Sequence, residues 1–124
     1  ETTLPDDLRE IAILTTARFW DCQYEWTAHQ KIAEGEAGTR TEAIEAIRDR
    51  KAPVGLTPDE TIVFNYVSEL LNNHRVSDLT FKIANDHFGN KATVDLTATA
   101  GYYSMIASTL NAFNVEPDVG TLPI

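Results

Sequence analysis

The segment from Asn90 to about Phe113 restricts the fold most, because its apolar residues recur at helical spacing on two faces. One face carries Val94, Ala98, Gly101, Met105, Ser108 and Ala112, and the other carries Leu96, Ala100, Tyr103, Ile106, Leu110 and Phe113. A helix that is apolar almost all round is buried on most sides. We therefore expect this helix either at the centre of a helical domain or in a subunit interface.

Capping and helix-breaking residues divide the rest of the chain into shorter helices. The predicted helix starts are Pro5, Asp21, Thr39, Thr57, Ser77 and Asn90. The first helix should end near Arg18, and the second should run from Cys22 to about Glu34 with Asp21 as its N-cap. The tail from Val115 should be extended and could reach a partner subunit. No stretch shows strand alternation, so the predicted fold class is all-α, a helical bundle of about five to six helices.

Bulk properties limit the classes of partner. The 124 residues suit a single domain spanning 1–124. A formal net charge of −9 with scattered Lys and Arg predicts no nucleic-acid partner and no membrane-surface partner. The single cysteine cannot form an intrachain disulfide and fits a reducing compartment. With no signal peptide and no apolar run near the ~20 residues that span a bilayer, we expect a soluble, cytoplasmic protein.

Three chemically capable side chains share one face of the second predicted helix. Cys22, Glu25 and His29 stand at positions i, i+3 and i+7 in an otherwise apolar stripe. Burying these groups costs several kcal/mol unless they satisfy one another. Glu10 would be ~18 Å from Cys22 on an unbroken helix, so the two can meet only if the chain turns between Arg18 and Asp21. The predicted N-cap at Asp21 implies such a turn, and we expect Glu10, Cys22, Glu25 and His29 to be catalytic.

The spacing Glu10–x11–Cys22–x2–Glu25–x3–His29 resembles that of the alkylhydroperoxidase D-like family, which includes the carboxymuconolactone decarboxylases. The peroxidase branch has a second Cys where this chain has Glu25. The segments LREIAILTTARFWDCQYEWTAH and HFGNKATVDLTATAGYYSMIASTLNAF look like the decarboxylase branch. The resemblance implies an all-helical fold that assembles as a homotrimer or homohexamer, with active sites near subunit contacts. It also implies further helices on the N-terminal side of Glu1.

The missing second Cys bears on the chemistry, because disulfide-based peroxide reduction needs a resolving thiol beside the attacking one. Lyase chemistry of the decarboxylase type needs a group that protonates carbon after CO₂ leaves a γ-lactone acid. The hypothesis is that His29 is the general acid/base, that Glu10 or Glu25 orients it, and that Cys22 is a pocket wall or auxiliary donor. Such an enzyme acts on a small carboxylated or lactone substrate and needs no cofactor and no metal.

Two other functions stay open. A thiol-dependent peroxidase would use Cys22 with an external resolving thiol, and a non-catalytic oligomeric protein would only bind a small molecule. A zinc site built from the same four side chains is a weaker alternative. The sequence does not give the sign of the Cys22 pKa shift, because a helix N-terminus lowers a thiol pKa and a neighbouring Glu25 raises it. We expect Trp20, Trp26, Tyr102 and Tyr103 in the core or the pocket wall.

Overall fold

The computed structural model of the chain describes residues 3–118 and 120–124. It consists of helices and connecting segments: α1 (Asp6–Phe19), α2 (Gln23–Glu34), α3 (Thr41–Arg48), α4 (Pro58–Asn73), α5 (Asp78–Phe88) and α6 (Asn90–Ala112). No strand occurs among the described residues, which confirms the all-α prediction. None of the helices in this part of the chain is long and apolar enough to cross a membrane.

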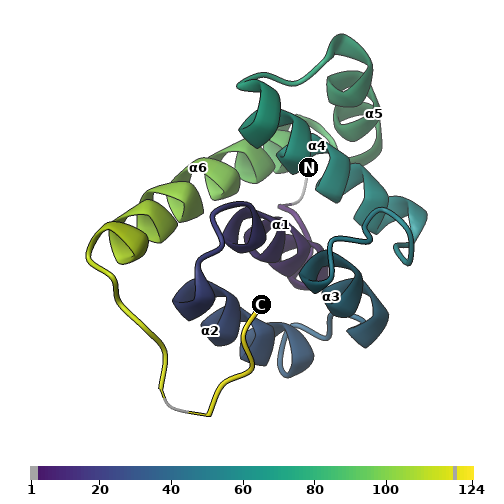
Figure 1. The fold of residues 1–124 in the computed structure, drawn as a ribbon. Coiled ribbons are helices and arrows are strands. Elements are labelled where there is room, and N and C mark those ends of the chain that lie inside the picture. Colours follow the sequence, from purple (N-terminus) through teal and green to yellow (C-terminus); the bar gives the residue numbers. More distant parts are fainter. Residues whose placement is uncertain (1–2, 119) are drawn as a thin grey trace.

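Helix α1 lies at the centre of the bundle (Figure 1). Helices α2, α3, α4 and α6 all pack against it, and α5 packs on α4 and α6. Every residue of α1 from 11 to 17 is buried. The hydroxyls of Thr15 and Thr16 donate to the carbonyls of Ile11 and Ala12 at 2.7 and 2.8 Å, so these polar side chains enter the core with their donors satisfied. The central helix therefore carries Glu10 in a well-packed position.

Helix α6 has one buried face and one exposed face. Leu96 and Ala100 are fully buried, whereas Val94, Tyr102 and Met105 are 61, 55 and 58% exposed. Of the two positions expected for this helix, the centre of the domain is wrong, because α1 has the larger share of buried residues and takes that place. The alternative, an interface with another subunit, stays a prediction.

Threonine hydroxyls in α6 bond within the helix itself. Thr93, Thr97, Thr99 and Thr109 each donate to the carbonyl four residues earlier, at 2.7–2.9 Å. This back-bonding satisfies the hydroxyl donors within the helix, and the Thr97 oxygen also lies 2.6 Å from the Tyr66 hydroxyl of α4.

Two of the predicted caps are confirmed. Thr57 and Glu60 form a capping box with Pro58 at the first helical position, and the Ser77 hydroxyl accepts from the Thr80 amide. The predicted cap at Thr39 is wrong. Its hydroxyl instead donates to the Asp7 carbonyl at 3.0 Å and so ties the loop to α1. The N-cap of α3 is the next residue, Arg40.

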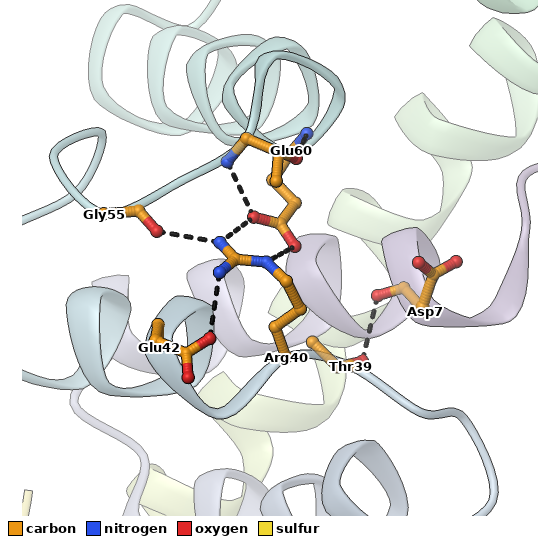
Figure 2. A network of polar contacts seen from close by, with 7 residues as sticks. Asp7, Thr39, Arg40, Glu42, Gly55 and Glu60 are labelled. Atoms are coloured by element: carbon orange, nitrogen blue, oxygen red, sulfur yellow. Dashed lines mark hydrogen bonds and ion pairs between the residues drawn. The ribbon is translucent and has the colours of Figure 1, made fainter.

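Arg40 joins the starts of α3 and α4 (Figure 2). Its guanidinium donates to both carboxylate oxygens of Glu60, at 3.1 and 2.7 Å, and also to Glu42 and to the Gly55 carbonyl. Glu60 is only 4% exposed. Burial alone would raise the pKa of Glu60, but the bonds from Arg40 and Thr57 outweigh burial and hold the pKa below its usual value. The buried carboxylate is therefore stabilised in its charged form.

The C-terminal tail returns to its own domain (Figure 1). Gln23 of α2 donates to the Leu122 carbonyl at 2.9 Å and accepts from the Ile124 amide at 2.8 Å. Arg48 donates to the Pro123 carbonyl at 2.7 Å. The tail has no regular secondary structure where it is described, as expected, but the end of the chain is held by α2 and α3 of the same chain.

Candidate active site

A tight turn between α1 and α2 produces the site. Helix α1 ends at Phe19, and Asp21 has a left-handed φ of 49°. The Asp21 carboxylate accepts bonds from Arg18 and Arg50, and the prediction that it caps α2 is wrong because these arginines bind it instead. Cys22 occupies the N-cap position in an extended conformation, rather than the first helical turn. The sequence-based prediction that the chain turns near residue 20 agrees with this geometry.

The turn brings Glu10 and His29 into direct contact. His29 Nδ1 lies 2.8 Å from Glu10 Oε1, and the two side chains are 15% and 7% exposed. A carboxylate can only accept, so the proton between them is assigned to Nδ1. With Nδ1 bonded to Glu10, Nε2 is the ring nitrogen left to take up or release a proton. Glu10, and not Glu25, is therefore the group that orients the imidazole.

Glu25 is a buried carboxyl group without a hydrogen-bond partner. The residue is 3% exposed, and neither side-chain oxygen has a partner within the described part of the chain. Burial raises its pKa to about 8. Glu25 is consequently a neutral carboxylic acid at pH 7, able to donate an O–H bond.

Cys22 is also buried, with 1% of its surface exposed. Burial, together with the nearby Glu25 carboxyl, raises the pKa of its thiol, while backbone N–H groups of Tyr24 and Glu25 partly oppose the shift. The net direction is upward, so the thiol form is favoured at neutral pH. Cys22 is thus placed beside Glu25 as a protonated group in the wall of the site.

Tyr103 of α6 completes the cluster. Its ring stands edge-on to the His29 ring, with centroids 5.1 Å apart and planes at 81°. Burial and the charges of Glu10 and Glu25 raise the pKa of its phenol. Tyr103 therefore lies near both carboxyl groups. The sequence predicted only that Tyr103 lies in the core or a pocket wall. Its hydroxyl on an otherwise apolar helix face is the feature that could have indicated a place in the site.

A pocket of about 420 Å³ opens beside Glu10. Its lining residues are Asp6, Arg9, Glu10, Ile32, Glu36 and Ala37. Arg9 donates to both carboxylate oxygens of Asp95 in α6, at 2.6 and 3.3 Å, which fixes the guanidinium at this edge. The sequence did not point to Arg9 for two reasons. Arg9 directly precedes Glu10, and adjacent residues on a helix do not share a face. Its partner Asp95 is far away in the sequence.

The four predicted residues thus form two neighbouring pairs. Glu10 bonds to His29, and Cys22 lies within electrostatic reach of Glu25. Tyr103 interacts with both carboxyl groups and links the pairs. Across the residues that the structure describes, no group of three or more His, Cys, Asp and Glu side chains is arranged to hold a metal ion.

We expect native Cys22 to react with an aromatic disulfide reagent roughly 100-fold more slowly than Cys22 in the urea-unfolded chain, because the folded thiol is buried and protonated. Stopped-flow absorbance measures both rates, and the unfolded chain is the control for intrinsic reactivity. Rapid labelling of the folded chain, with sulfenate formed by peroxide, would contradict this and support the thiol peroxidase alternative.

Comparison with known families agrees with the resemblance in the sequence. The model of the carboxymuconolactone decarboxylase family matches residues 1–69, more than half of the chain. The matched segment contains Glu10, Cys22, Glu25 and His29. The chain therefore belongs to the carboxymuconolactone decarboxylase family, within the alkylhydroperoxidase D-like group. Comparisons with curated proteins and with solved structures gave no significant match.

Proposed function

We propose that this protein is a carboxymuconolactone decarboxylase-like lyase that acts on a small carboxylated lactone by proton transfer, without a cofactor. The observation that carries the proposal is the partly buried Glu10–His29 pair beside a neutral Glu25. An oriented imidazole and a carboxylic acid that is still protonated at pH 7 are the two groups that such a reaction needs.

The reaction breaks the bond between a substrate carbon and its carboxylate. The electron pair of that bond moves into the conjugated lactone carbonyl as a dienolate, and CO₂ leaves. Glu25 donates a hydrogen bond to the developing oxyanion, since its carboxyl group is neutral and unpartnered. His29 Nε2, with Nδ1 held by Glu10, then delivers a proton to carbon and is reprotonated from solvent.

Arg9 is the proposed anchor for a second carboxylate of the substrate. It lines the pocket beside Glu10, and its bonds to Asp95 keep the guanidinium in place. The acidic side chains of Asp6 and Glu36 line the same pocket and repel an anion, so they restrict the carboxylate to the Arg9 side.

The buried, protonated state of Cys22 favours the lyase over the thiol peroxidase, which needs an accessible thiolate. A direct assay separates the lyase from a non-catalytic binder. Incubating the chain with carboxymuconolactone in D₂O should release CO₂ and place one deuterium on the carbon that lost it, as seen by NMR. Binding of the lactone without CO₂ release would reject the lyase.

We also propose that the chain forms a homotrimer or homohexamer through the exposed face of α6. Val94, Tyr102 and Met105 expose apolar surface there, and Tyr102 stacks edge-on against Tyr103 of the site, with centroids 5.1 Å apart. An interface on this face would shield the site from water. Light scattering should give a multiple of the 13.8 kDa chain, and Met105→Glu should lower it. A wild-type monomer at micromolar concentration would contradict the proposal.

A further inference from the structure

A second pocket lies away from Glu10 and His29, between the C-terminal half of α1, the end of α3 and α4. Its volume is about 170 Å³. Its lining residues include two aromatic residues, Phe19 and Phe64, two arginines, Arg18 and Arg50, and Ser68. None of the four predicted catalytic residues lines it.

The two arginines are held in place by the protein. Arg18 Nε donates to the Arg48 carbonyl at 2.8 Å, and both guanidinium groups bind the Asp21 carboxylate. A guanidinium has five N–H donors, and these contacts use two from Arg18 and one from Arg50. Two cations against one carboxylate leave a net positive charge at this pocket, in a chain whose total formal charge is −9. The pocket is therefore suited to an anion.

The volume limits the size of the ligand. An apolar protein cavity of roughly 150 Å³ is known to accommodate benzene. This second pocket, at about 170 Å³, has room for one six-membered ring, and Phe19, Phe64 and Leu71 offer it apolar contacts. A carboxylate on that ring would meet the planar guanidinium groups, which match its two oxygens.

We propose that this pocket binds a monocyclic carboxylate, with the ring against Phe19 and Phe64 and the carboxylate paired with Arg18 and Arg50. The proposal does not depend on the lyase function, because the pocket shares no lining residue with the Glu10–His29 site. It assigns the protein a second ligand site beside the turn that positions Cys22.

Benzoate is the probe, titrated into the intact chain and followed by ¹⁵N NMR and calorimetry. We expect saturable binding with amide shifts around Phe64, Ser68 and Leu71. The neutral analogue benzamide, which keeps the ring, and acetate, which keeps the carboxylate, should each bind about tenfold more weakly or worse.

Matched variants test the contacts. Arg50→Gln should weaken benzoate binding about tenfold, because it removes the charge and keeps an unbranched side chain. Ser68→Leu should fill the pocket and abolish binding. Lys82→Gln is the control, since it removes a cation that pairs with Asp86 on the surface of α5. His29→Ala should leave benzoate affinity unchanged, which separates this proposal from the lyase.

Two outcomes would overturn the proposal. One is equal affinity for benzoate and benzamide, or unchanged affinity in a folded Arg50→Gln variant, because the guanidinium groups would then not recognise the ligand. The other is a set of amide shifts centred on His29 and Tyr103, because benzoate would then occupy the catalytic site.

Discussion

Replacing His29 with alanine should lower turnover of a γ-lactone acid by about 10²- to 10⁴-fold, because the imidazole held by Glu10 is the group that carries the proton to carbon. Turnover is measured as CO₂ release at saturating substrate, with circular dichroism showing that the helices remain. Added imidazole should restore part of the rate in this variant, since the deleted ring leaves space beside Glu10 and Tyr103.

His29→Asn is the matched control for the first prediction. Its amide nitrogen can replace Nδ1 as donor to Glu10, so the buried carboxylate keeps its partner, but an amide does not titrate. We expect this variant to be as stable as the wild type within about 1 kcal/mol and as inactive as His29→Ala. Near wild-type turnover in His29→Asn would exclude His29 as the proton donor.

Glu25→Gln should stabilise the fold by a few kcal/mol at pH 8–9 and leave stability at pH 5 nearly unchanged. Burial raises the Glu25 pKa from 4.5 to about 8, so between these pH values the native state holds a proton that the unfolded chain releases. The stability of the wild type therefore falls as pH rises through this window, at up to about 1.4 kcal/mol per pH unit. The Glu25→Gln variant should not show this fall in stability, because glutamine is neutral at every pH.

Urea unfolding at fixed protein concentration from pH 5 to pH 9 measures the effect, since a changing degree of association would also shift stability. Glu34→Gln is the control, because Glu34 lies at the exposed end of the same helix. Its pH dependence should follow that of the wild type. Parallel curves for Glu25→Gln and the wild type would show that Glu25 is already ionised in the folded protein.

Most of the fold was predictable from local signals. Capping and breaking residues act within one turn of a helix, so Thr57, Ser77 and Gly89 correctly marked helix ends. The errors arose where a long-range partner competed for the cap. Asp21 binds Arg50, which is 29 residues away, and Thr39 binds the Asp7 carbonyl, so neither caps a helix.

The sequence predicted which residues form the candidate site, but it did not predict which of them bond to one another. Helical spacing placed Cys22, Glu25 and His29 on one face, and the turn at residues 20–22 added Glu10. Which carboxylate would hold the imidazole depended on how α1 crosses α2, and no spacing rule gives that angle. The raised pKa of Glu25 likewise follows from burial by several helices, which local sequence does not encode.

The threonines of α6 affect how hydrophobic the surface of this helix is. By sequence, Thr93, Thr97, Thr99 and Thr109 make the segment look moderately hydrophilic. Thr97 and Thr109 are the exposed members of this set, and their hydroxyls already donate to carbonyls of the same helix. Another helix can approach such a surface without stripping water from a hydroxyl. Residue-based hydropathy thus underestimates how readily α6 can adhere to a second apolar surface.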